Sequence, residues 1–536
     1  MAVLDDEGLL RPGEVQVVRL SFCPASDAQV TALRDAARRG LSAEVEALLQ
    51  RPQDPDLGHP APLFEASKHS QTQVVRLLLE ANADKDKAEH YSGATPLLVA
   101  AEFGCLEVAR RLLEANADKD KEARDGATPL FAAALNGQLE VARLLLKSNA
   151  DKDKAVQNGA SPLWIAANAG HLEVARLLLQ VNADKDKATY NGATPLAVAA
   201  RNGDLEVARL LLEANADKDK EARDGATPLF IAAQHGRLEV ARLLLKSNAD
   251  KDKAVQNGAT PLFMAAQTGE LEVARLLLQA NADKDKAMHN GATPLNVAAQ
   301  NGDLEVARLL LESNADKNKA DRDGATPLFM AASAGQLEVA RLLLQVNADK
   351  DKAMHYGATP LVVAAQNGDL EVARLLLEAN ADKDKDARDG ATPLFIAALN
   401  GRLEVARLLL ESNADKDKTQ QYGASPLRIA ANAGHLEVAR LLLQVNADKD
   451  KVARLLLEAK ADKNKEARDG ATPLFIAAQH GRLEVARLLL KSNADKDKAE
   501  QNGATPLFMA AQTGELEVAR LVQESDTNKN KRAKYR

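Results

Sequence analysis

The chain has 536 residues, and 27% of them are charged. Acidic and basic residues nearly balance, with a net charge of −7, so the chain lacks the excess of positive charge that is typical of a nucleic-acid-binding protein. Its two cysteines, Cys23 and Cys105, exclude a disulfide framework and fit a reducing compartment. There is no apolar run of about 18 residues and no apolar core of a signal peptide near the N-terminus, so we expect a cytoplasmic or nuclear protein without membrane insertion.

Residues 1–28 differ in sequence from the rest of the chain. Their spaced apolar residues suggest a short strand, namely Val15, Val17, Leu20 and Phe22. Residues 29–58 predict a polar helix pair, with Arg34, Arg38 and Glu46 among its charged residues. A stack of repeats needs a polar unit at its end, because the outer face of that unit meets water. We therefore expect a degenerate capping unit at 29–58.

From residue 59 to residue 451 the chain repeats one segment of sequence. Regular copies begin at Gly93, Gly126, Gly159, Gly192, Gly225, Gly258, Gly291, Gly324, Gly357, Gly390 and Gly423, so their spacing is always 33 residues. A fixed period of this length is the signature of a stacked-repeat architecture.

The copy from Gly225 to Asn257 illustrates the expected fold of one repeat. Thr227 and Pro228 predict a helix start, because the hydroxyl caps a backbone N–H and proline suits the first helical position. This first helix is expected to end at Gly236. A second helix from Leu238 to about residue 247 is apolar on most sides and polar on one face. Such short helices are marginal alone, so each repeat must stack on its neighbours.

Two asparagines mark the loops of this repeat. Asn248 stands where a left-handed residue usually ends a helix, a conformation that asparagine tolerates. Asn257 precedes Gly258, and this pair is a strong signal for a tight turn that opens the next repeat.

The order Gly-x-Thr-Pro-Leu, Ala-Ala, Gly-x-Leu-Glu-Val, Leu-Leu-Leu, Ala-Asp closely resembles the ankyrin repeat, over roughly residues 30 to 522. The resemblance implies an all-α solenoid of about 14–15 repeats, each a helix-turn-helix unit with a short β-hairpin loop. It also implies a non-catalytic protein that binds other proteins.

Three positions depart from the ankyrin pattern. The histidine usual after Thr-Pro-Leu is replaced by residues such as Phe230, Trp164, Asn296 and Arg428. Asn248 stands for the usual glycine, and Lys-Asp follows Ala-Asp instead of Val-Asn. These changes put in question the hydrogen bond of that histidine and the packing under the hairpin, but not the fold.

The regular spacing breaks once, after Lys451. Residues 452–465 nearly copy residues 438–451, with no first helix between them. We interpret 452–469 as a truncated half repeat. Either the solenoid kinks there, or the extra helix swings out and exposes its leucines, or the duplication is an error in the sequence. We expect the weakest point of the stack at this place.

Regular repeats return at residues 470–522. The last second helix becomes polar at Gln523 and Glu524, as an end cap requires. Residues 523–536 are basic, and we interpret them as a solvated tail in preference to a nuclear localisation signal.

The sequence contains no pattern typical of catalysis or metal binding. It has no Gly-rich phosphate loop, no His-Glu-x-x-His and no nucleophile paired with a base. The Asn-Ala-Asp-Lys-Asp-Lys runs alternate as calcium ligands do, but Lys253 and Ala259 stand where such a loop needs Gly and Glu. We therefore expect no cofactor and no metal, and interpret the runs as neutral ladders of Asp and Lys.

The repeats vary at the hairpin tips and at the ends of the first helices, whereas the second helix hardly changes. In ankyrin repeats these positions line a groove that meets protein partners, so the resemblance implies a binding role; the alternative is drift at exposed positions. The candidate tip residues are Tyr190, Asn191, Arg223, Asp224, Gln256, Asn257, His289 and Asn290, and the candidate helix-end residues are Gln234, His235, Gln267 and Thr268.

The position after Pro-Leu carries Phe or Trp in most units but Asn296 and Arg428 in others, so we expect it to be partly accessible. Its phenylalanines are either partner anchors or packing between repeats, and we favour packing. They include Phe131, Phe230, Phe263 and Phe395.

Three functional hypotheses follow. The first is a monomeric scaffold or adaptor that holds partner proteins and no nucleic acid. The second is a structural spacer or cytoskeletal linker, in which the number of repeats matters and the tip residues do not. The third is a targeting subunit for an enzyme whose catalytic domain lies on another chain.

Overall fold

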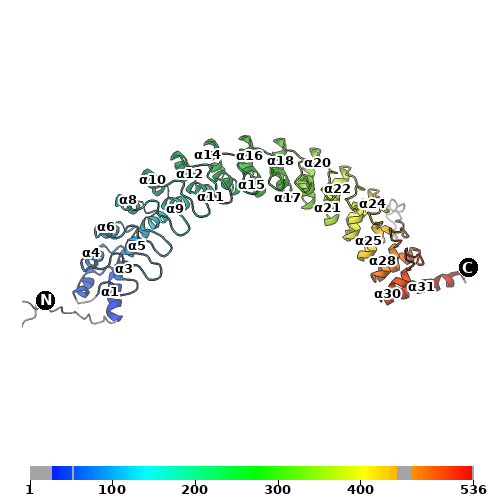
Figure 1. Cartoon of the computed structure of the whole chain (residues 1–536), viewed down its shortest axis with the longest axis horizontal. Coiled ribbons are helices and arrows are strands. Elements are labelled where there is room, and N and C mark those ends of the chain that lie inside the picture. Colours follow the sequence, from blue (N-terminus) through cyan, green and yellow to red (C-terminus); the bar gives the residue numbers. More distant parts are fainter. Residues whose placement is uncertain (1–26, 51–53, 444–460, 534–536) are drawn as a thin grey trace, which may run out of the picture. The chain divides into compact units, whose positions relative to one another are not determined.

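The computed structural model describes residues 27–50, 54–443 and 461–533, and all regular secondary structure in these ranges is helical (Figure 1). The chain divides into two compact units. Unit 1 is Met1–Ala232 with Arg237–Asp250, and unit 2 is Ala233–Gly236 with Lys251–Arg536. The strand suggested near Val15 and the helix of the half repeat, residues 452–459, lie outside the described residues and stay predictions.

Unit 1 is built from helix pairs. Its first helices are α1 (Asp27–Arg39), α3 (Pro62–Lys68), α5 (Pro96–Glu102), α7 (Pro129–Leu135), α9 (Pro162–Ala169), α11 (Pro195–Asn202) and most of α13 (Pro228–Gln234), whose last two residues belong to unit 2. Its second helices are α2 (Ser42–Leu49), α4 (Thr72–Glu80), α6 (Leu106–Glu114), α8 (Leu139–Lys147), α10 (Leu172–Gln180), α12 (Leu205–Glu213) and α14 (Leu238–Lys246). The polar pair expected at 29–58 is present as α1 and α2.

Unit 2 has the same construction. Its first helices are α15 (Pro261–Thr268), α17 (Pro294–Asn301), α19 (Pro327–Ser333), α21 (Pro360–Asn367), α23 (Pro393–Leu399), α25 (Pro426–Ala433), α28 (Pro473–Gln479) and α30 (Pro506–Gln512). Its second helices are α16 (Leu271–Gln279), α18 (Leu304–Glu312), α20 (Leu337–Gln345), α22 (Leu370–Glu378), α24 (Leu403–Glu411), α26 (Leu436–Leu443), α29 (Leu483–Lys491) and α31 (Leu516–Ala533). Within each unit, first helices pack on first helices and second helices on second helices of the neighbouring repeats.

A capping hydroxyl opens the regular first helices, as expected. In α15 the Thr260 Oγ1 accepts the Phe263 N–H at 3.1 Å, and Pro261 takes the first helical position. Ser161 and Ser425 cap α9 and α25 in the same way. These caps satisfy a donor that the helix itself leaves unpaired.

The second helices end in the left-handed turn predicted for Asn248, whose φ is 60°. Its counterparts from Asn82 to Asn493 share this conformation wherever the chain is described. Asparagine serves here because it tolerates a positive φ better than most residues that carry a Cβ.

The loops expected to be β-hairpins are tight turns without strands in the described ranges. The Val255 N–H donates to the Ala259 carbonyl at 2.9 Å, and the Gly258 N–H donates to the Val255 carbonyl at 2.8 Å. The Asn257 side chain accepts the Ala259 N–H at 3.0 Å, which is an Asx turn. So few bonds close each turn that no strand ladder develops.

The core of each repeat is small and apolar. In the repeat of α15 and α16, the side chains of Leu262, Ala265, Val273 and Leu277 are fully buried. Burying one leucine stabilises the fold by about 1.5–3 kcal/mol, and the paired alanines let neighbouring first helices approach closely.

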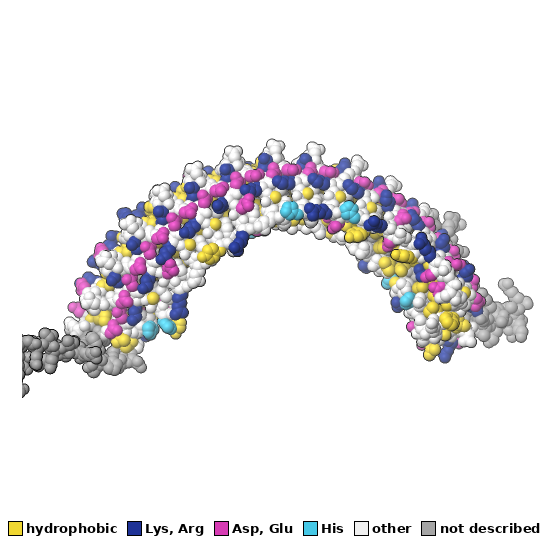
Figure 2. All heavy atoms as spheres, viewed as in Figure 1, with side chains coloured by type: hydrophobic (Ala, Val, Ile, Leu, Met, Phe, Trp, Pro, Cys, Tyr) yellow, Lys and Arg dark blue, Asp and Glu magenta, His cyan; other side chains and the backbone are white. Residues whose placement is uncertain are grey.

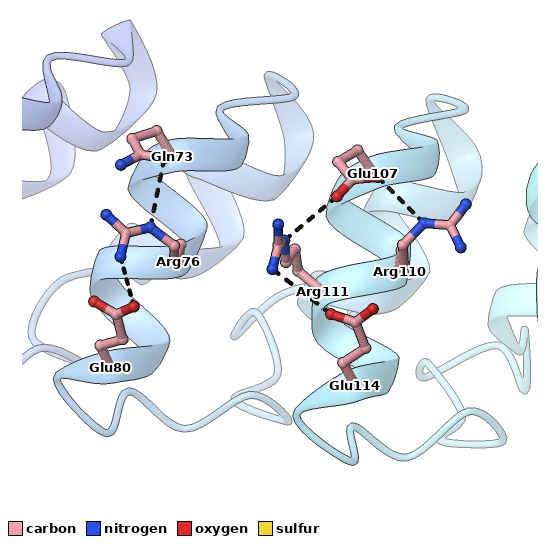
Figure 3. A network of polar contacts seen from close by, with 7 residues as sticks. All are labelled: Gln73, Arg76, Glu80, Glu107, Arg110, Arg111 and Glu114. Carbon is pink, nitrogen blue, oxygen red and sulfur yellow. Dashed lines mark hydrogen bonds and ion pairs between the residues drawn. The ribbon is translucent and has the colours of Figure 1, made fainter.

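The outward faces of the second helices carry charges that pair with each other. In α6 the Arg110 Nε lies 3.2 Å from Glu107, which also pairs with Arg111 at 3.4 Å, and in α4 Arg76 pairs with Glu80 at 2.7 Å (Figure 3). Most other second helices repeat the pair three residues apart. Such exposed pairs each contribute little, but they engage most of the arginines on these faces.

Aspartates link each repeat to the next. The Asp316 N–H donates to the Asp285 carboxylate at 2.9 Å, the Asp285 N–H donates to Asp283 at 3.0 Å, and the Lys319 Nζ reaches the Asp285 carbonyl at 2.7 Å. Equivalent aspartate bonds recur along both units. Both residue types of the predicted ladder thus link the repeats, but they bond to the backbone: the Asp carboxylate accepts an N–H and the Lys ammonium donates to a carbonyl, in place of the predicted Asp–Lys pairs.

The break in the sequence spacing leaves no gap in the stack of unit 2. The Asp462 N–H donates to Asp417 across 45 residues at 2.7 Å, where regular repeats make this bond across 31 residues. The Arg482 Nε donates to the Asn432 carbonyl across 50 residues, where regular repeats span 36. Helix α28 packs directly on α25.

The last described repeat leaves apolar side chains exposed on its free face. Phe508 is 56% exposed, whereas its counterpart Phe475 in the preceding repeat is only 2% exposed. Leu516 is 76% exposed. Helix α31 continues to Ala533, past the residue where the basic tail is predicted to begin.

Candidate functional site

All twelve candidate residues lie on exposed positions of the two units. Tyr190, Asn191, Arg223 and Asp224 belong to unit 1, and Gln234, His235, Gln256, Asn257, Gln267, Thr268, His289 and Asn290 belong to unit 2. Their common exposure agrees with the selection from the sequence, where only the variable positions were chosen.

Backbone hydrogen bonds join neighbouring hairpin tips within each unit. In unit 1 the Arg223 N–H donates to the Asn191 carbonyl at 2.9 Å, and in unit 2 the His289 N–H donates to the Asn257 carbonyl at 2.8 Å. A Cβ on Gly258 would lie 2.8 Å from the His289 nitrogen, so glycine is required for this approach. The tips therefore form an ordered row in each unit, with one pair of side chains for each repeat.

The two residues of a tip have different roles. The second residue closes the turn with its side chain: Asp224 accepts the Ala226 N–H at 3.1 Å, and Asn290 accepts the Ala292 N–H at 3.0 Å, as Asn257 does in its own repeat. Replacing these residues would disturb the turn itself. The first residue does not close its own turn, although its side chain bonds the neighbouring tip in some repeats, as the Gln157 Nε2 donates to the Arg124 carbonyl at 2.6 Å.

The helix-end candidates also divide into two kinds. The Thr268 hydroxyl donates to the Met264 carbonyl of its own helix at 2.9 Å, which makes it a local structural residue. The Gln267 carbonyl accepts the Asn301 side chain of the next repeat at 2.8 Å, whereas the Gln267 side chain stays exposed. Gln234 and His235 are exposed at the end of α13.

Four tyrosines stand on hairpin tips, and only one of them was selected from the sequence. Tyr91, Tyr190, Tyr356 and Tyr422 are 81%, 70%, 71% and 68% exposed. The chain has five tyrosines in all. Each of the four comes one or two residues before the glycine that opens a repeat, and this placement is the sequence signal that could have identified them.

The hairpin tip of Tyr91 has an unusual carboxylate. The Glu89 side chain accepts the N–H groups of Ser92 at 2.7 Å and of Tyr91 at 3.0 Å, together with the Ser92 hydroxyl. These bonds stabilise the charged form and lower the pKa of Glu89 from its ordinary 4.5 to about 2.

The residues after Pro-Leu pack between repeats, which confirms the preferred interpretation for the phenylalanines. Phe131, Phe230, Phe263 and Phe395 are buried. Phe395, for example, packs against Ala391 and Ala424. The expectation that this position is partly accessible is wrong for them, because the hairpin of the next repeat covers the ring.

Polar replacements at this position keep a hydrogen bond to the next repeat. The Asn296 Nδ2 donates to the Ala325 carbonyl at 3.1 Å, and the Trp164 Nε1 donates to the Ala193 carbonyl at 3.0 Å. Arg428 instead pairs its guanidinium with Asp469 at 3.3 Å. Asn and Trp thus replace the donor of the missing histidine, and Arg reaches the next tip.

Unit 1 contains a hollow of about 460 Å³ beside α5 and α7. Its apolar lining includes Phe64, Leu98, Phe131 and Leu135, together with Phe103, which is 50% exposed. The Lys68 Nζ lies 5.6 Å from the centre of the Phe103 ring. Charged side chains line it as well, namely Lys68, Glu102, Arg124 and Asp125, so the lining is mixed.

The described ranges contain no group of three His, Cys, Asp or Glu side chains placed to hold a metal ion. In the same ranges, no helix combines the length and apolar character needed to cross a bilayer.

Comparison with known proteins identifies the repeats. A search of curated proteins finds no match. The sequence model described as ankyrin repeats (3 copies) matches overlapping segments at residues 33–123, 83–156, 115–189, 132–222, 184–255, 229–321, 313–389, 380–453 and 447–533. Together with the stacked helix pairs of both units, these matches show that the chain belongs to the ankyrin-repeat family.

Proposed function

We propose that this protein is a non-catalytic scaffold or adaptor that holds partner proteins on its hairpin tips and first-helix ends. Ankyrin repeats are in general modules for protein–protein interaction. The observation that carries the proposal is the ordered row of exposed tip side chains, joined by bonds such as His289 N–H to Asn257 O. A pre-ordered row lowers the entropy cost of binding.

The opposite face is a poorer site for a partner. Its glutamates and arginines pair with each other along the second helices, as Glu272 does with Arg275 at 3.7 Å. A partner on that face would have to replace these pairs with its own. The tips offer aromatic and amide groups instead, and large aromatic side chains are enriched where binding energy concentrates.

The test is affinity capture from native lysate with three baits. The first bait is the whole chain. The second carries Gln234, His235, Gln256, Gln267 and His289 changed to alanine, which spares the turn-forming Asn257 and Asn290. The third carries Glu239, Arg242, Glu272, Arg275 and Gln279 changed to alanine, on the outward faces of second helices.

We expect the first and third baits to capture a common partner that the second bait loses. All three must show equal helical content by circular dichroism. Equal capture by the first two baits, with loss on deleting a whole repeat, would favour a structural spacer in place of the scaffold.

A further inference from the structure

Unit 2 carries a second feature on its tips, outside the candidate residues chosen from the sequence. Five consecutive tips from Arg322 to Asp469 alternate between an Arg-Asp pair and a pair that ends in tyrosine. Both residues of each tip are exposed, and the arginines and tyrosines among them are, in order, Arg322, Tyr356, Arg388, Tyr422 and Arg468. We call this row the Arg-Tyr ladder. In Figure 2, cyan histidine and dark blue Lys or Arg side chains alternate along one edge of the unit 2 repeats, with yellow hydrophobic side chains beyond them.

Backbone bonds connect each tip of the ladder to the next. The Arg388 N–H donates to the Tyr356 carbonyl at 3.0 Å, and the Arg468 N–H donates to the Tyr422 carbonyl at 3.3 Å. The last bond bridges the irregular part of the sequence, so the ladder continues through it. These backbone bonds keep the tips of the ladder in a fixed order, one tip for each repeat.

The arginines of the ladder are not used by the fold. Within the ranges that the structure describes, the guanidinium groups of Arg322, Arg388 and Arg468 make no hydrogen bond or ion pair. This sets them apart from the arginines of the second helices, which pair with glutamate, and from Arg428, which pairs with Asp469.

Two of the three aspartates beside these arginines accept a backbone N–H with their carboxylate. Asp389 accepts the Ala391 N–H at 3.1 Å, and Asp469 accepts the Ala471 N–H at 3.0 Å besides the Arg428 pair. Only Asp323 keeps a carboxylate without such a bond, because Asp321 takes the N–H of Ala325. A partner that approaches the ladder therefore meets exposed arginine and tyrosine side chains, beside carboxylates that at two of the three Arg-Asp tips already accept a backbone N–H.

From this arrangement we infer that the Arg-Tyr ladder binds an extended acidic segment of a partner protein, with aromatic side chains between its carboxylates. The inference rests on the proposed scaffold function and adds the chemistry of the partner. Arginine forms strong, directed bonds to carboxylates, and tyrosine packs against aromatic rings. A nucleic acid fits less well, since the arginines stand only at every second tip and the phosphates between them would find no cation, whereas the carboxylates of a peptide can be spaced to match the arginines.

The repeat spacing sets the spacing of the partner's residues. Neighbouring helices pack roughly 8–10 Å apart, so arginines two repeats apart are separated by roughly 16–20 Å. An extended chain rises about 3.3 Å per residue. Carboxylates should therefore recur about every six residues in the partner, with an aromatic residue midway.

The test uses a labelled peptide of about thirteen residues, with Glu at both ends and at its centre, Phe midway between them, and Ser and Gly elsewhere. Fluorescence anisotropy with the full chain should give a Kd of about tens of micromolar, weaker at high salt. Arg388→Gln and Tyr356→Ala should each weaken binding by about tenfold. The matched control is Arg374→Gln in α22, which should leave binding unchanged.

Three results would overturn the inference. One is equal binding of the same peptide with Lys in place of Glu. Another is tighter binding of a single strand of about twelve thymidines, which would assign the ladder to nucleic acid. The third is no binding of the acidic peptide at all. If the lysate capture still depends on the tips in that case, the scaffold function stands and only the acidic partner is withdrawn.

Discussion

At the scale of single residues, the regular first helices begin at buried hydroxyl groups. Thr260 is fully buried, and its oxygen accepts the N–H of Phe263. Without that oxygen the N–H would be buried without a partner, which costs about 1–3 kcal/mol. Two repeats use serine at the same position, at Ser161 and Ser425.

We therefore expect Thr260→Ala to lower the free energy of unfolding by about 1–2 kcal/mol, and Thr260→Ser to keep most of the stability. Urea denaturation followed by circular dichroism measures both. If the serine variant lost as much stability as the alanine variant, the cap would not be the reason for the buried threonine.

At the scale of elements, the stack is held together by short links that repeat with the sequence. The carboxylate of Asp285 accepts the N–H of Asp316 in the next repeat. Between two other pairs of repeats the acceptor is an asparagine side chain. Asn318 accepts the Asp349 N–H at 2.8 Å, and Asn464 accepts the Asp495 N–H at 2.8 Å. The link needs an acceptor oxygen more than it needs a negative charge.

Because an asparagine can replace the aspartate in this bond, two variants of Asp285 should differ in stability. Asp285→Ala removes the acceptor and should destabilise unit 2 by about 1 kcal/mol. Asp285→Asn keeps an acceptor oxygen and should be close to neutral. The measurement is again the urea midpoint, now at low and high salt. A loss in the asparagine variant that disappears at high salt would show that charge, and not the hydrogen bond, links the repeats.

At the scale of the whole molecule, the stack depends on contacts between the helices of neighbouring repeats. Helix α28 contacts α25 although the sequence between them is 14 residues longer than in a regular repeat. Each repeat contacts only its neighbours, so a stack can close over an insertion at the cost of a loop.

Deletion of Val452–Lys465 should therefore leave the urea midpoint of the chain unchanged or higher. The matched control is deletion of Val306–Lys319, a segment of the same length and nearly the same sequence that contains all but the first two residues of α18. That deletion should lower the midpoint clearly and expose apolar surface to a dye. Equal damage by both deletions would mean that the duplicated residues support the stack.

Much of the fold can be predicted from the sequence because each repeat is formed by interactions between residues close in the chain. The cap at Thr260, the left-handed Asn248 and the two helices of each repeat depend on residues close in the chain, and all are present as expected. The binding candidates were chosen by variability, which predicts exposure well. It does not separate Asp224, which closes its own turn, from Tyr190, which does not.

By itself, then, the sequence determined the period, the helix pairs and the order in which they stack, because caps and turns act over a few residues. Only the tertiary structure decided which side chains remain available. Asp389 is used by its turn and Phe395 is covered by the next repeat, whereas Arg388 and Tyr356 stay exposed on neighbouring tips. Availability depends on hydrogen bonds and burial between repeats, and those exist only once the repeats have stacked.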